Sequence, residues 1–179
     1  MRNWLIASLL LIFSCTERTQ IEEIEQKSYH IVGYVAGWKT INPKKIPAEK
    51  LTHINYAFAD VANGVVTHME GRAERDSLNF LQLQELKKRN PDLKLLVSIG
   101  GWTHSKGFSD AVLIPESRKK LTESGIQFLL KYKLDGLDFD WEYPALQGDN
   151  NVVRPEDREN FVAMLKSFRE ALDSVGNLN

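Results

Sequence analysis

The chain has 179 residues, of which 42% are hydrophobic and 26% charged. This length suits one domain, and the composition is that of a globular protein with enough apolar material for a core. The formal net charge of −1 gives no electrostatic reason to expect nucleic acid or an anionic membrane surface as a partner. One cysteine excludes an internal disulfide, and no Cys/His cluster has zinc-ligand spacing, so we expect no metal and no cofactor. No feature of the sequence points to a protein partner.

The first fifteen residues differ from the rest of the chain. Arg2 and the amino terminus supply positive charge, and an apolar run extends from Trp4 to Phe13. This pattern predicts a secretion signal in residues 1–15, since the run is too short to span a bilayer comfortably. Its end, Ile-Phe-Ser-Cys at 12–15, resembles a bacterial lipoprotein cleavage box, which implies a mature chain that begins with an acylated Cys15. An ordinary cleaved signal with an incidental cysteine stays open as the alternative. The polar residues 16–28 predict a flexible tether.

The next part of the chain alternates between two kinds of pattern. Short apolar runs predict strands at 31–37, 51–59, 94–100 and 134–141. Helical patterns begin at the expected caps Asp76 and Ser77, at Pro115 and at Pro155, and the last of them ends at Gly176. Residues 38–50 are too polar and proline-rich for a long helix. The order strand, loop, strand, helix, strand, helix, strand, helix predicts an α/β fold with a parallel sheet.

The last predicted strand carries an unusual set of acids. Because side chains alternate along a strand, Asp138, Asp140 and Glu142 share one face, with neighbours about 6–7 Å apart. The apolar residues at 137, 139 and 141 take the other face. Parallel strands usually carry apolar side chains on both faces, so a row of buried acids has a cost and no structural purpose. This pattern favours catalytic carboxylates.

A solvated edge strand and a calcium loop are less favoured for these acids. An exposed edge strand could carry a solvated acidic face, but the interleaved aromatic residues argue against exposure. A calcium loop also alternates acidic ligands, but it needs glycine at its sixth position, where this chain has Tyr143. Carboxylates this close cannot all ionise, so at least one titrates high, as the general acid of a glycosidase must. Glu142 lies nearest the carboxyl end of the strand, where parallel α/β folds place their active sites.

The acidic strand matches a family signature, Asp-x-x-Asp-x-Asp-x-Glu, at Asp135, Asp138, Asp140 and Glu142. With a second motif, Ser98-Ile99-Gly100-Gly101-Trp102, it resembles glycoside hydrolase family 18, and bacterial chitinases in particular. Tyr34 and the pair Ala57-Phe58 also look like family positions. The resemblance runs from about His30 to the end of the chain.

The resemblance implies a TIM barrel that hydrolyses β-1,4-linked N-acetylglucosamine polymers by substrate-assisted, retaining catalysis. Glu142 would be the general acid and base. Asp140 would orient the acetamido group of the substrate and stabilise the charged intermediate. Asp138 would share a proton with Asp140, and Tyr34 and Ser98 would hydrogen-bond this acid pair.

The remaining family positions would bind the sugar. Phe58, Tyr143 and the glycines Gly100 and Gly101 would shape its site, and Trp102 would stack on a sugar ring. For each aromatic residue, plain core packing stays open as the alternative. Asp135 has the other parity along the strand, and we interpret it as structural.

The chain is shorter than the family's fold, because an eight-stranded barrel needs about 250 residues. Only four strands are visible, and the family's Met-x-Tyr-Asp motif and floor tryptophan are absent. We therefore expect residues 29–179 to be the amino-terminal half of the catalytic domain, comprising its first four βα units. The expected partner is chitin or chitooligosaccharides. The expected location is the bacterial cell envelope, through a lipid on Cys15, or otherwise the medium. A noncatalytic chitin-binding lectin and an endo-β-N-acetylglucosaminidase remain as alternative functions.

Overall fold

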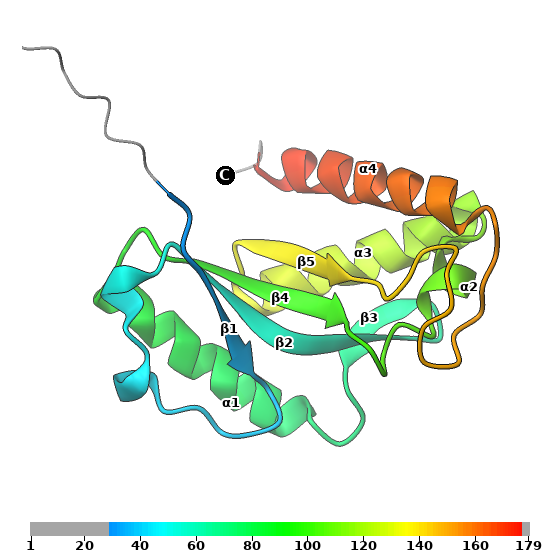
Figure 1. Ribbon diagram of the computed structural model, residues 1–179. Coiled ribbons are helices and arrows are strands. Elements are labelled where there is room, and N and C mark those ends of the chain that lie inside the picture. The colour runs from blue at the N-terminus through cyan, green and yellow to red at the C-terminus, as the bar shows by residue number, and fades with distance from the viewer. Residues whose placement is uncertain (1–28, 177–179) are drawn as a thin grey trace, which may run out of the picture.

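A computed structural model of the protein describes residues 29–176 (Figure 1). The predicted secretion signal, the tether and Cys15 lie outside these residues. The helices among residues 29–176 are all too short or too polar to cross a membrane.

The described residues form an α/β fold built on one five-stranded sheet. Four strands are parallel and adjacent in the order β1 (Val32–Ala36), β2 (His53–Ala62), β4 (Lys94–Gly100) and β5 (Gly136–Asp140). These are the four strands that the apolar runs predict, so the expectation of an α/β fold with a parallel sheet is confirmed. In Figure 1 the arrowheads of β4 and β5 point the same way.

The helices lie where the sequence places them, with two additions. They are α1 (Ala73–Gln84), α2 (Phe108–Val112), α3 (Pro115–Tyr132) and α4 (Asp157–Gly176). A 3₁₀ turn, Glu85–Lys88, extends α1, and the short helix α2 has no counterpart among the predicted helices. Residues 38–50 hold only the 3₁₀ turns Pro43–Lys45 and Ala48–Lys50, as their polar composition indicates.

The expected caps of the first helix are wrong. Helix α1 begins three residues before Asp76, and Asp76 is only 1% exposed. Its carboxylate accepts a hydrogen bond from the Tyr56 hydroxyl at 2.6 Å and lies 3.0 Å from Nδ1 of His68. The Ser77 hydroxyl donates to the carbonyl of Ala73 within the helix. Asp76 is therefore a buried hydrogen-bonding partner of the sheet, although its residue type suits a cap.

Strand β3 (Val65–His68), which pairs antiparallel with the end of β2, is absent from the predicted strands. Asn63 and Gly64 connect β2 to β3, and both have positive φ values, 54° and 74°. A two-residue loop of this conformation, with Asn-Gly, is the preferred turn of a β-hairpin. The Asn-Gly pair was the sequence signal for this hairpin.

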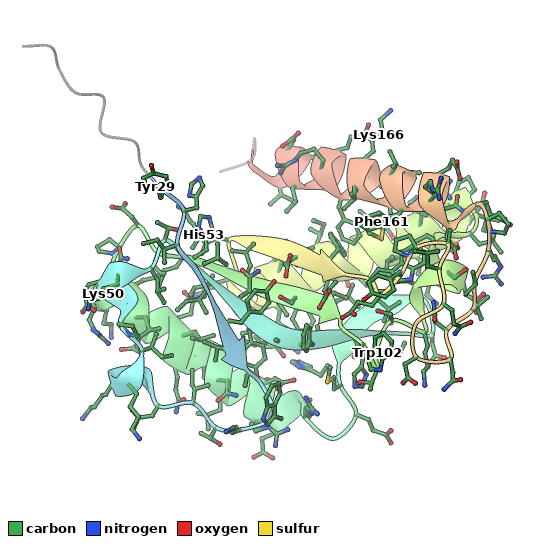
Figure 2. The ribbon with its side chains drawn as sticks, viewed as in Figure 1. Tyr29, Lys50, His53, Trp102, Phe161 and Lys166 are labelled. Atoms are coloured by element: carbon green, nitrogen blue, oxygen red, sulfur yellow. The ribbon has the colours of Figure 1, made fainter. Side chains whose placement is uncertain are left out.

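The core fills one side of the sheet. Buried side chains of β2 and β4 meet those of α1 and α3, and they include Ile54, Leu95, Val97, Ile99, Phe80, Leu83, Leu121 and Phe128. Under β5, the ring of Phe139 packs on Phe168 of α4 with centroids 4.7 Å apart. Figure 2 shows Phe161 of α4 between the helix and the sheet, and Lys166 pointing away from it. The acids of β5 have the opposite parity to Phe139, so they face the other side of the sheet.

Candidate active site

The strand register brings the candidate residues together at the carboxyl ends of β4 and β5. Ser98 pairs with Asp138, and Gly100 pairs with Asp140. Paired residues of neighbouring strands face the same side of a sheet. These four residues therefore lie on the face opposite the helical core. Figure 2 shows Trp102 beyond the arrowhead of β4, at the end of the sheet where these rows finish.

Asp138 is held by two hydroxyl groups from other strands. The Tyr34 hydroxyl donates to Oδ2 of Asp138 at 2.9 Å, and the Ser98 hydroxyl donates to the same oxygen at 2.6 Å. Ser98 is fully buried. Hydrogen bonds that a carboxylate accepts fix its orientation. The contacts that the family resemblance implies for Tyr34 and Ser98 are thus present, and both are made to Asp138.

Asp140 is the crowded acid of the row. Burial raises the pKa of its carboxyl, and the charges of Glu142 and then Asp138 add to this effect. The expectation that at least one of the three acids titrates high is therefore met by Asp140. A carboxyl with a raised pKa holds a proton at a pH where an ordinary aspartate has lost it.

Removing the charge of Glu142 should bring the pKa of Asp140 down. We expect the Glu142→Gln variant to titrate Asp140 at lower pH than the parent protein, because one of the two repelling charges is gone. NMR of the Asp140 side-chain carboxyl carbon as a function of pH measures this midpoint. The control is Glu116→Gln, at an exposed position in the first turn of α3, which should leave the midpoint in place. An unchanged midpoint in Glu142→Gln would show that the two carboxyl groups do not interact.

The two glycines after β4 allow the backbone to approach β5. Gly100 and Gly101 have φ values of 108° and 88°, a conformation that other residues rarely adopt. A Cβ atom on Gly100 would lie 2.5 Å from the carbonyl oxygen of Asp140. A Cβ atom on Gly101 would lie 3.2 Å from the ring of Phe58, so Phe58 covers this glycine. The glycine pair therefore sets the distance between the end of β4 and the acidic strand.

Trp102 and Tyr143 are exposed beside this edge. Trp102 is 53% exposed and Tyr143 is 43% exposed, and their ring centroids lie 6.5 Å apart at 68°. A hydrogen bond with the carboxylate of Glu142 raises the pKa of the Tyr143 phenol. Plain core packing is therefore wrong for these two residues, and their rings are available to a ligand.

Asp135 has a different role from Asp138, Asp140 and Glu142. Asp135, just before the strand, accepts hydrogen bonds from Nζ of Lys87 and from the backbone N–H of Leu95 at 2.7 Å. Its interpretation as structural is confirmed. On the face away from the acids, Trp141 is 5% exposed and stacks on Phe108 with the rings 13° from parallel.

A calcium loop and a solvated edge strand both fit the acidic row less well than a catalytic role. No group of three or more His, Cys, Asp or Glu side chains within residues 29–176 is arranged to hold a metal ion. Strand β5 does lie at one edge of the described sheet. Its acidic face is not simply solvated, however, because Asp138 and Asp140 are half-buried and Asp138 is bonded to groups from β1 and β4.

Two polar residues near this site were not predicted from the sequence. Asn55 on β2 pairs with Tyr34, is 5% exposed, and its Oδ1 has no hydrogen-bond partner among the described residues. The sequence feature that could have identified Asn55 is its polar amide side chain within an apolar run. Ser105, in the loop after β4, is 1% exposed and accepts a hydrogen bond from the backbone N–H of Glu142 at 2.9 Å. No sequence pattern distinguished Ser105 from other loop serines.

Comparisons with known proteins agree with this geometry. The family model described as "Glycosyl hydrolases family 18" matches residues 30–177. Chitinase A1 of Niallia circulans is 35% identical over 197 aligned residues, which cover 83% of this chain and 28% of that protein.

Solved structures give the same result. Chitinase ChiW from Paenibacillus sp. str. FPU-7, described as cell-surface-expressed and multi-modular, is 45% identical with a TM-score of 0.75 over 84% of this chain and 15% of its own. Human YKL-39, described as a pseudo-chitinase with retained chitooligosaccharide binding, is 28% identical with a TM-score of 0.71 over 85% of this chain and 41% of its own. The chain thus spans less than half the length of each of these three proteins.

Proposed function

The chain belongs to glycoside hydrolase family 18, and we propose that it carries the catalytic acids of a chitinase-like glycosidase. The substrate would be a β-1,4-linked N-acetylglucosamine polymer or oligomer, cleaved with retention of configuration. The observation that carries this proposal is the pair of acids on β5, just before Glu142: Asp138 accepts two hydrogen bonds, and the pKa of Asp140 is raised.

In the proposed reaction, Glu142 donates its proton to the glycosidic oxygen as the bond to the anomeric carbon breaks. The acetamido oxygen of the same sugar attacks that carbon and forms an oxazolinium ion. Asp140 ends β5 two residues before Glu142, and its carboxyl group would hold the acetamido N–H and stabilise the positive charge. Water then attacks the anomeric carbon, the bond from that carbon to the acetamido oxygen breaks, and the water gives a proton to Glu142, which restores the acid. Asp138, fixed by Tyr34 and Ser98, would share a proton with Asp140.

The sugar would lie across the carboxyl ends of the strands. Phe58, above Gly101, would form part of the site's wall, and Gly100 allows the close approach of the Asp140 backbone. Trp102 and Tyr143 offer exposed rings, and aromatic faces pack well on sugar rings. Their exposure supports this assignment over a role in the core.

We further propose that residues 29–179 form the first half of an eight-stranded barrel. Among the described strands, β1 and β5 each have one neighbour, and a closed barrel pairs every strand on both sides. The row of acids would then face the barrel interior. Active sites of such barrels lie at the carboxyl ends of the strands, and Asp140 is the last residue of β5.

The proposed location is outside the cell. Residues 1–15 would direct export, and an acylated Cys15 would hold the protein at the cell envelope, with residues 16–28 as a tether. The description of the Paenibacillus relative as cell-surface-expressed supports a location of this kind.

Binding without turnover is the second candidate function. The similarity to human YKL-39, described as a pseudo-chitinase that retains chitooligosaccharide binding, is the observation in its favour. Glu142 favours the enzyme, because noncatalytic relatives usually lose this glutamate. An endo-β-N-acetylglucosaminidase would use the same acids and differ in the sugars that it binds.

Two matched substrates test the proposed reaction. The full-length protein should release the fluorophore from a chitobioside and should not cleave the corresponding cellobioside, in which hydroxyl groups replace the acetamido groups. NMR of the first products from a chitooligosaccharide should show the β anomer. Initial release of the α anomer, or equal cleavage of both fluorogenic substrates, would contradict substrate-assisted retention. Binding with no cleavage would support the second candidate.

A further inference from the structure

The buried hydroxyl of Ser105 lies between the ends of β4 and β5. The last direct rung between these strands is the hydrogen bond from the Gly101 N–H to the Asp140 carbonyl, at 2.8 Å. In a parallel ladder the next rung would run from the Glu142 N–H to the Gly101 carbonyl. That rung is replaced by two bonds: the Glu142 N–H donates to Ser105 Oγ at 2.9 Å, and Ser105 Oγ donates to the Gly101 carbonyl at 2.9 Å.

The hydroxyl has one proton, and its second acceptor is the Asp140 carbonyl at 3.2 Å. Each of the two carbonyls already accepts one backbone hydrogen bond, that of Asp140 from Gly101 and that of Gly101 from His104. The shorter distance therefore favours the Gly101 carbonyl as the acceptor of the hydroxyl proton. Ser105 is thereby an inserted link in the ladder. It joins the two strand ends through one oxygen atom at the residue that carries the proposed acid.

The loop that holds Ser105 is itself fixed against the core. Phe108, three residues later, is fully buried and stacks on Trp141 with ring centroids 5.2 Å apart. Gly107 packs so closely on β2 that a Cβ atom there would lie 1.9 Å from the Val61 carbonyl oxygen. These contacts leave the hydroxyl little freedom to move.

We propose that Ser105 is a positioning residue for Glu142. Its hydroxyl holds the Glu142 backbone away from β4 and so directs the carboxyl group toward the space beside Asp140. This inference rests on the proposed function, because it explains how Glu142, the proposed general acid, is held in position. A water molecule could make the same two bonds, but its immobilisation has an entropic cost that the covalently held hydroxyl avoids.

The chain offers a matched control. Ser124 Oγ accepts a hydrogen bond from the Val66 N–H at 2.9 Å and donates to the Leu121 carbonyl at 2.8 Å. It thus makes the same pair of bonds as Ser105, but it joins β3 to α3 and contacts none of the candidate site residues. Ser124→Ala therefore removes an equivalent link without touching the site.

In the full-length protein, Ser105→Ala should lower kcat on a fluorogenic chitobioside by about tenfold to a hundredfold, with KM changed about twofold or less. Ser124→Ala should keep the parent kcat, and Ser105→Thr, which retains the hydroxyl, should recover most of it. Equal kcat values for Ser105→Ala and the parent would overturn the proposal. Equal losses in Ser105→Ala and Ser124→Ala would also overturn it, because the effect would then be structural. If Ser105→Ala does not fold, Ser105→Cys takes its place, because a thiol fills similar space but bonds weakly.

Amide hydrogen exchange tests the same proposal without catalysis. The Glu142 amide should exchange about tenfold to a hundredfold faster in Ser105→Ala than in the parent, while the Val66 amide is unchanged. Ser124→Ala should show the reverse pattern. If no variant, including the parent, cleaves chitobioside, the proposed function fails, and the exchange rates still decide whether Ser105 holds Glu142. Unchanged exchange at Glu142 in Ser105→Ala would refute the positioning role.

Discussion

Replacing Glu142 with glutamine in the full-length protein should lower kcat on a chitobioside by about 10²–10⁴-fold, the usual contribution of general acid catalysis. Glutamine has nearly the same shape but no proton to give to the glycosidic oxygen. The backbone N–H that binds Ser105 Oγ is kept, so the strand end should not move. KM and the affinity for chitooligosaccharides should therefore stay close to the parent values. Steady-state kinetics and calorimetric titration with a chitooligosaccharide measure the two effects separately.

The matched control for this variant is Glu116→Gln. Glu116 is exposed in the first turn of α3, so its replacement makes the same change of one charge in a part of the chain away from β5. This control should keep the parent kcat. Near-parent turnover in Glu142→Gln would remove Glu142 from the role of general acid, and a lost affinity for the sugar would indicate that its carboxylate binds substrate instead.

The second large effect should come from Asp140→Asn, with kcat lower by about 10²–10³-fold, which is the usual effect of removing one group that stabilises charge in a transition state. Asparagine still has a hydrogen-bonding oxygen but cannot bear the negative charge that faces the oxazolinium ion. Rate measurements on a chitobioside give the loss, and the exposed Asp92→Asn, in the turn before β4, is the control. A loss of less than about threefold would show that the charge at position 140 is not used.

Asp140→Asn should lose activity without losing stability. Because the folded-state pKa of Asp140 is raised, its protonated form is favoured by folding. Its contribution to stability is therefore complete below the unfolded pKa and is lost as the pH rises through the raised folded value. Asparagine is neutral at every pH, so at neutral pH the variant should unfold at the same denaturant concentration as the parent or at a higher one. A clear decrease in that midpoint would mean that the charged carboxylate of Asp140 stabilises the fold.

The sequence by itself determined the features that depend on covalent geometry and local pattern. Side-chain alternation along a strand places Asp138 and Asp140 of β5 on one face, whatever surrounds the strand. Asp135 precedes the strand and Glu142 follows it by two residues, so alternation alone does not place them. Apolar runs separated by helical patterns were sufficient for the four parallel strands and their order of appearance. The local pattern was misleading for Asp76, whose residue type is typical of a helix cap. Its partners Tyr56 and His68 belong to strands β2 and β3, which a local pattern cannot reveal.

Only the tertiary structure decided which groups meet at the site. Tyr34 and Ser98 bind the same oxygen of Asp138 across sequence separations of 104 and 40 residues, and this depends on the register of the strands that carry them. Ser105 reaches the Glu142 amide only because the loop after β4 is anchored by Phe108 on Trp141. Strand register and loop anchoring arise from packing between distant segments, and no local pattern encodes them.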